Sequence, residues 1–203
     1  MSQAVIVDFA AGEAEAPAAL RRMRWVSRGL EILFLVLAVG FGLIATAAIL
    51  DFIVPYAGDT LTLNPKGGFI TLGPHPHLPP GYIAPGAMPV VQRLAHVPVG
   101  LLHAAPTFIL FWSLQRLFGL YAKGIVFAPE NARHIKHIGA ALAVSAVAPF
   151  LGFSFLNSLG LAVDHTWAHG ASVQELVLGA IVYVIAQVMQ LGREIEEERS
   201  QFV

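Results

Sequence analysis

The amino-acid sequence predicts an all-α membrane protein, a bundle of four transmembrane helices with both termini in the cytoplasm. Of its 203 residues, 56% are hydrophobic and only 12% are charged. Soluble domains carry about 25% charged residues, so this chain has too little charge to cover a surface that faces water. Four windows reach the length of about 20 apolar residues that a helix needs to cross the hydrocarbon core. Lysines and arginines gather between alternate windows, and this asymmetry predicts their orientation.

The four predicted spans carry no charged side chain in their interior, apart from Glu175 near the start of the fourth. The first is longer than the apolar core of a cleaved signal peptide, which usually holds about 7–15 residues, so we expect it to be retained. Residues 1–29 are predicted to form a cytoplasmic tail, and residues 30–203 a single membrane domain. The spans are Ile32–Leu50, Val97–Phe118, Ile138–Leu159 and Val173–Leu191.

Ten of the twelve lysines and arginines fall on one side of the predicted spans. Four precede the first span, four lie at the end of the second span or between it and the third, and two follow the fourth. An excess of positive charge marks the cytoplasmic side of short loops. Both termini and the hairpin at residues 119–137 are therefore predicted to be cytoplasmic. The ten are Arg21, Arg22, Arg24, Arg28, Arg116, Lys123, Arg133, Lys136, Arg193 and Arg199.

The loop at residues 52–96 is predicted to lie on the outer side. Its stretch DTLTLNPKGGFITL alternates weakly around a turn-forming centre, which suggests a short β-hairpin. Imidazoles on this side are reasonable ligands for zinc or copper, although none of the established metal-site spacings is present and surface or packing roles remain open for them. The four candidate metal ligands are His75, His77, His165 and His169.

No cofactor is expected from the sequence. The chain contains no cysteine, which excludes disulfides, thiolate metal sites and iron–sulfur clusters. A bis-histidine haem site needs two facing imidazoles inside the spans, and His103 is the one histidine that a span contains. Proton- or ion-coupled carriers usually place ionisable groups deep in the membrane, whereas the acidic residues here lie at span ends.

The predicted cytoplasmic hairpin joins the second and third spans. Gly124 permits a chain reversal, and a new helix is predicted to begin near Pro129, because proline is well placed in a first helical turn. Glu130 favours the positive end of that helix. Ala128 stands where a capping serine or threonine would be expected. After the fourth span, residues 192–203 form an acidic, charged tail.

Two stretches carry a resemblance to a known family. LQRLFGLYAKGIVFAPENARHIKHIGAAL and LVLGAIVYVIAQVMQLGREIEEERSQFV resemble the bacterial membrane family known as domain of unknown function 2975. The resemblance covers most of the chain from the first span onward and is strongest after Leu114. Ala128 and the histidine-rich loop depart from the family pattern. The positions on that pattern are Gly124, Phe127, Pro129, Glu130, Asn131 and Gly139.

The resemblance implies a four-helix protein of the bacterial inner (plasma) membrane with no assigned activity and no catalytic residues to carry over. Family members often lie beside genes for small helix-turn-helix regulators, which suggests membrane sensing or sequestration of a regulator.

Three classes of function remain from the sequence. The favoured one is a non-enzymatic membrane protein that binds a cytoplasmic protein, or a further copy of itself, through the hairpin and the C-terminal helix. The alternative is a small transporter or an outward-facing metal-binding membrane protein. An enzyme is not expected, because the sequence has no nucleophile–base arrangement, no HExxH motif and no paired acids at a shared depth. Nucleic acid is not an expected partner.

Overall fold

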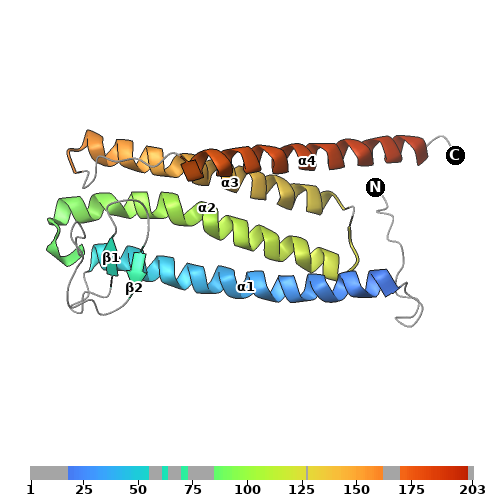
Figure 1. Cartoon of the computed structure of the whole chain (residues 1–203), viewed down its shortest axis with the longest axis horizontal. Helices are drawn as coiled ribbons and strands as arrows, with labels where there is room; N and C mark the ends of the chain where they lie inside the picture. Colours follow the sequence, from blue (N-terminus) through green and yellow to red (C-terminus); the bar gives the residue numbers. More distant parts are fainter. Residues whose placement is uncertain are drawn as a thin grey trace. The chain divides into compact units, whose positions relative to one another are not determined.

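Four long α-helices dominate the described part of the chain (Figure 1). Each contains one of the predicted spans, except that Leu159 lies just beyond the third helix. All four are long and apolar enough to cross a membrane, which confirms the all-α prediction with four such helices and indicates a multi-pass membrane protein. They are α1 (Ala18–Ile53), α2 (Val90–Ala122), α3 (Pro129–Ser158) and α4 (Gly170–Ser200). The structure, a computed structural model, describes residues 18–54, 61–63, 70–72, 85–126, 128–161 and 170–200.

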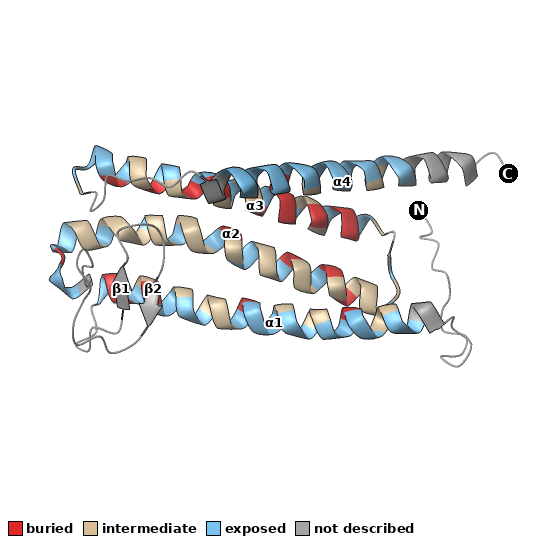
Figure 2. Cartoon of the chain, viewed as in Figure 1, coloured by how far each residue is buried: buried red, intermediate tan, exposed pale blue. Residues whose placement is uncertain are grey.

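The burial pattern is the one expected when lipid replaces water around the helices. Large aliphatic side chains are exposed, for example Leu43 (68%) and Val188 (63%), whereas the best buried side chains are small, such as Ala38 (1%) and Ala186 (0%). Figure 2 shows this exposure along α1 and α4. Small residues at helix contacts let the two backbones approach closely. In lipid this close packing drives the helices to associate, because the hydrophobic effect does not bring apolar surfaces together there.

The chain divides into two compact units, and each of the four helices contributes to both. The first unit comprises Met1–Val39, Ile109–Ala141 and Leu178–Val203, and the second comprises Gly40–Phe108 and Leu142–Val177. The first unit therefore contains the end of α2, the connection to α3 and the C-terminal part of α4. The predicted cytoplasmic hairpin and its neighbours belong to this unit.

Close contacts between helices also build the second unit. The rings of Phe52 on α1 and His96 on α2 stack, with centroids 5.6 Å apart. The side-chain amide of Gln92 donates a hydrogen bond to the carbonyl of Leu161 (3.1 Å), just beyond α3. On α3, a Cβ placed on Gly152 would lie 2.8 Å from Cγ1 of Val99, so a larger residue there would force the Val99 side chain or the helices to shift.

Shorter elements join α1 to α2. Strands β1 (Leu61–Leu63) and β2 (Ile70–Leu72) pair antiparallel, with Leu61 opposite Leu72 and Leu63 opposite Ile70. The 3₁₀ helix η1 (Pro85–Ala87) precedes α2.

Candidate functional site: the α2–α3 hairpin and its neighbours

A glycine-centred turn ends α2. Gly124 has φ +81°, a left-handed conformation that L side chains rarely adopt. The N–H of Gly124 donates to the carbonyl of Tyr121 (3.0 Å), and the N–H of Ile125 donates to that of Leu120 (3.0 Å). This pair of hydrogen bonds is the Schellman motif, which satisfies carbonyls that a helix end otherwise leaves unpaired. The motif fixes the direction in which the chain leaves α2.

Asn131 connects this turn to the first turn of α3. Its side chain is completely buried (0% exposed). Nδ2 donates two hydrogen bonds, to the carbonyl of Ile125 at 2.9 Å and to the carbonyl of Val126 at 2.7 Å. Among the described residues, nothing donates to its buried Oδ1. Because one side chain satisfies two carbonyls of the connection, Asn131 holds the connection against the start of α3.

Helix α3 begins at Pro129, without a side-chain cap from Ala128. The backbone N–H of Asn131 instead donates to the carbonyl of Ala128 (3.0 Å). Glu130 lies in the first turn and is exposed, where its negative charge favours the positive end of the helix dipole.

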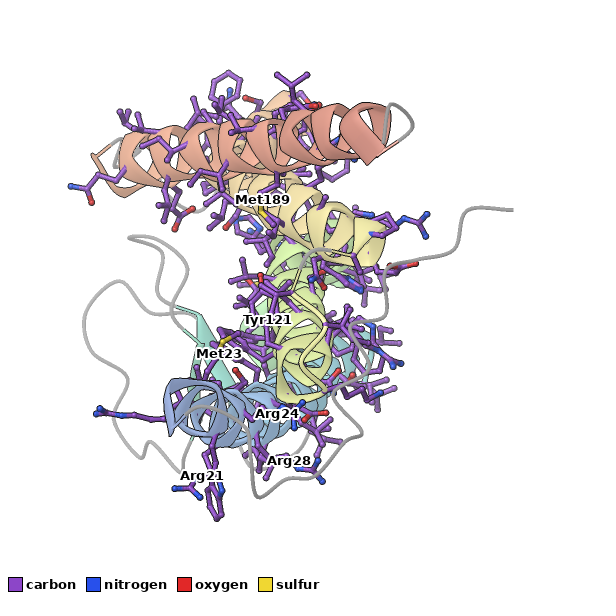
Figure 3. The ribbon with its side chains drawn as sticks, turned by 90° about the vertical axis from the view of Figure 1, so that its right-hand side faces the viewer. Arg21, Met23, Arg24, Arg28, Tyr121 and Met189 are labelled. Atoms are coloured by element: carbon purple, nitrogen blue, oxygen red, sulfur yellow. The ribbon has the colours of Figure 1, made fainter. Side chains whose placement is uncertain are left out.

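Polar side chains of α1 pack against the end of α2. Figure 3 shows Arg24 directed towards this end, while Arg21 points away from it. A Cβ placed on Gly124 would lie 3.1 Å from a terminal guanidinium nitrogen of Arg24, and a Cβ on Gly119 would lie 3.0 Å from Oε1 of Glu31. Ser27, between them on the same helix face, is only 4% exposed. The two glycines therefore make room for an arginine and a glutamate at this helix contact.

An aromatic layer follows this polar contact. The ring of Phe34 on α1 stacks on Phe118 at 5.6 Å and on Phe111 at 6.4 Å. Phe118 also meets Tyr121 edge-on, with centroids 6.0 Å apart. Aromatic pairs of this kind contribute about 0.5–1.5 kcal/mol beyond the area that they bury. The layer joins α1 to α2 immediately beside the Arg24 and Glu31 contacts.

Helices α3 and α4 meet through a glycine contact and one hydrogen bond. A Cβ placed on Gly139 would lie 3.0 Å from the carbonyl oxygen of Gly179 and 3.0 Å from the backbone nitrogen of Tyr183. One turn earlier, Nζ of Lys136 donates to the side-chain carbonyl of Gln190 at 2.6 Å. These contacts place the C-terminal part of α4 beside the start of α3.

Charged side chains at the hairpin face outward. Lys123, Glu130 and Arg133 are exposed. His134 and His137 meet edge-on with ring centroids 6.3 Å apart. In the part of the chain that the structure describes, no three histidines or carboxylates gather as a metal site would require. The turn, to which Asn131 donates two hydrogen bonds, presents charges of both signs.

Five of the six positions on the family pattern lie in the first unit, and they are Gly124, Pro129, Glu130, Asn131 and Gly139. The sequence did not predict the approach of Arg24 to Gly124 or of Glu31 to Gly119, for which the glycines near the end of α2 were the available signal. It also did not predict the hydrogen bond from Lys136 to Gln190. The remaining candidates lie outside the described residues and are Phe127, His75, His77, His165 and His169.

Substitution of Gly124 by alanine is expected to destabilise the protein by about 1–2 kcal/mol, because a side chain in the left-handed region is strained and the new Cβ would also displace Arg24. Gly160 is a matched control. It has φ +67°, ends α3 with the same pair of hydrogen bonds, and has no atom near its missing Cβ. Gly160→Ala should show the backbone cost alone. The unfolding temperature in detergent measures the stability of both variants. A larger decrease for Gly160→Ala than for Gly124→Ala would contradict the contact between Arg24 and Gly124.

Comparison with known proteins places the chain in a family. No curated protein and no solved structure shows a significant similarity to it. A family model described as "Protein of unknown function (DUF2975)" matches residues 80–201, a range that runs from before α2 to the end of α4 and includes the whole hairpin. Because this match covers more than half of the chain, the protein belongs to that family.

Proposed function

We propose that the protein is a non-enzymatic, multi-pass protein of the bacterial inner membrane that binds a cytoplasmic protein partner. In this proposal both termini and the α2–α3 hairpin lie in the cytoplasm. The partner contacts the exposed charges of the hairpin and the end of α4. Membrane sensing or sequestration of a regulator is the role that such binding would serve.

The burial of Asn131 carries the proposal. The two hydrogen bonds from this buried side chain hold the connection between α2 and α3 in one arrangement. A fixed turn lowers the entropy lost when a partner binds. The charges of Lys123, Glu130 and Arg133 on this fixed turn offer a partner a defined electrostatic pattern, and such patterns give binding its specificity.

The C-terminal part of α4 supports a second contact region. The predicted fourth span ends at Leu191, but α4 continues to Ser200. This extension includes Glu194, Glu196, Glu197 and Glu198. An acidic helix that begins beside a cationic hairpin favours a partner with charges of both signs.

The orientation is supported by where the cations stand. Arg24 and Arg28 lie on the first turns of α1, and Lys123 and Arg133 flank the hairpin. Placing this unit in the cytoplasm puts them on the side where positive charge accumulates in membrane proteins.

A crosslinking pull-down from bacterial membranes tests the binding. The full chain is compared with a variant that carries Lys123→Gln and Arg133→Gln and lacks residues 193–203. The matched control carries Lys123→Arg and Arg133→Lys, which keeps both charges. We expect at least one soluble protein to co-purify with the wild type and the control, and to fall by roughly tenfold in the neutralised variant, the loss expected when about 1.4 kcal/mol of binding is removed. An identical set of captured proteins for all three chains would contradict the proposal.

A further inference from the structure

Gln187 stands out on α4 as an exposed polar side chain without a partner. It lies inside the stretch Val173–Gly192, which is apolar enough to cross a membrane. Its neighbours Val184 and Val188 are 58% and 63% exposed. No described residue forms a hydrogen bond with its amide. By contrast Gln190, three residues later, accepts from Lys136. An amide that faces hydrocarbon without a hydrogen bond is unfavourable, so Gln187 calls for a partner outside this copy of the chain.

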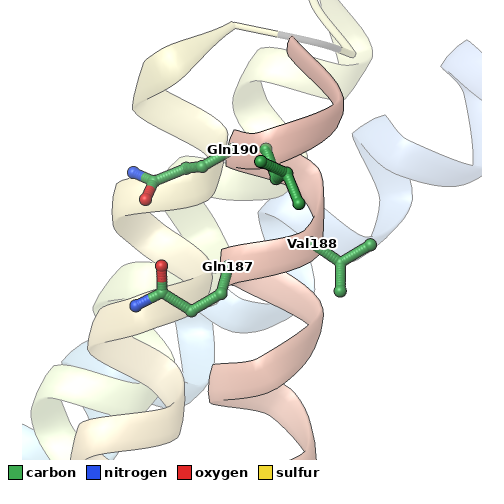
Figure 4. A pocket seen from close by; sticks show the side chains of 4 residues that line it. Gln187, Val188 and Gln190 are labelled. Atoms are coloured by element: carbon green, nitrogen blue, oxygen red, sulfur yellow. The ribbon is translucent and has the colours of Figure 1, made fainter. Parts of the chain in front are cut away.

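Gln187 belongs to a regular face of α4. Ala180, Val184, Gln187 and Leu191 follow one another at spacings of four, three and four residues, and all are exposed. This spacing keeps side chains on one stripe of a helix and is the repeat with which helices pack side by side. Figure 4 shows Gln187 and Gln190 directed to one side of α4 and Val188 to the other. These three residues and Leu191 line a hollow of about 330 Å³.

The stripe is distinct from the face that α4 uses within the molecule. The contact with α3 involves Gly179, Tyr183 and Gln190, together with Ala186, which is 0% exposed. At about 100° per residue, Ala180, Val184 and Leu191 lie roughly a quarter-turn or more from the middle of this contact, and Gln187 lies at its edge, about 60° from Gln190. A second helix can therefore pack on α4 without displacing α3.

We propose that this face of α4 packs against the same face of a second copy of the chain, in a parallel dimer with the Gln187 amides paired across the interface. Copies of one sequence insert into the membrane with the same orientation. A two-fold axis along the membrane normal therefore brings each Gln187 opposite its equivalent at the same depth. A carboxamide both donates and accepts, so two equivalent amides satisfy each other. Ala180 is small enough to allow close approach of the two helices.

The absence of cysteine from the chain makes a clean test possible. Single cysteines replace Val184 and Leu191 on the proposed face, and Leu178 and Ile185 on other faces of the same helix. All four native side chains are exposed to a similar degree, between 49% and 58%. Membranes that contain each full-length variant are treated with a mild oxidant, and the disulfide-linked dimer is measured by electrophoresis. We expect strong dimer formation at positions 184 and 191 and little at 178 and 185.

A second substitution tests the amide itself. Adding Gln187→Leu to Val184→Cys should lower the dimer yield by roughly three- to tenfold, the size expected for a hydrogen bond between membrane helices. Gln187→Asn, which keeps the amide, should preserve the yield. Gln174→Leu is the matched control, because Gln174 is an exposed glutamine on another face of α4. Equal linking at all four cysteines, no linking at any, linking to a different protein, or indifference to Gln187→Leu would each overturn the proposal.

Discussion

Asn131→Ala is expected to destabilise the protein by about 1–3 kcal/mol, because two part-buried carbonyls then lose their hydrogen-bond donor and each such bond contributes roughly 0.5–1.5 kcal/mol. In the wild type, the side-chain amide serves the carbonyls of Ile125 and Val126 while completely buried. The change should appear as a lower unfolding temperature of the detergent-solubilised protein. It should also raise the rate at which a protease cuts the chain between α2 and α3.

Two control variants separate this effect from a general loss of packing. Asn131→Asp keeps the shape of the side chain but removes the donor, so it should be nearly as destabilising as alanine. Asn157 on α3 is exposed, and Asn157→Ala should change the unfolding temperature little. If Asn131→Asp unfolds at the wild-type temperature, the two hydrogen bonds do not hold the hairpin.

Gly139→Ala is expected to destabilise the contact between α3 and α4 by about 1–3 kcal/mol, the usual range for overpacking a well-packed site. The new methyl group would lie 3.0 Å from two backbone atoms, the oxygen of Gly179 and the nitrogen of Tyr183. Backbone atoms of a helix cannot swing aside as a flexible side chain can, so the two helices must separate locally. The unfolding temperature in detergent measures the loss.

Helical glycines in open surroundings provide the comparison for Gly139. A Cβ placed on Gly29 or Gly40 meets no atom within 4 Å. Gly40→Ala should therefore stabilise α1 by roughly 0.5–1 kcal/mol, because alanine loses less backbone freedom in a helix than glycine does. The opposite signs for Gly139 and Gly40 are the expected result. A stabilising Gly139→Ala would mean that α3 and α4 do not approach closely at this point.

The four long helices could be predicted from the sequence because each contains a single uninterrupted apolar run, and the length of such a run relative to membrane thickness is a local property. The ends of the helices were less accessible. Helix α1 begins at Ala18, well before the apolar run that starts at Ile32, since hydropathy marks the part of a helix that lipid surrounds and not where the helix begins. Gly124 and Pro129 could be placed at the turn because their backbone preferences are also local.

The contacts between helices could not be predicted in the same way. A helix in water shows which face it buries by its apolar stripe, but a helix in lipid is apolar on every side. The small size of Gly139 suits a helix contact, but the residue that it meets, Tyr183, could not be predicted, nor could the partner of Lys136, Gln190. Asn131 was singled out by its place in a motif, and its partners Ile125 and Val126 became clear only once the turn was folded.

The proposed four-span topology is tested most directly by labelling with a membrane-impermeant maleimide in intact bacteria. Single cysteines at Ala87 and Lys123, both exposed in the structure, mark the two sides. Ala87→Cys should be labelled in intact cells, and Lys123→Cys should be labelled only after the membrane has been permeabilised. Labelling of Lys123→Cys in intact cells, with Ala87→Cys protected, would contradict the orientation and with it the cytoplasmic partner.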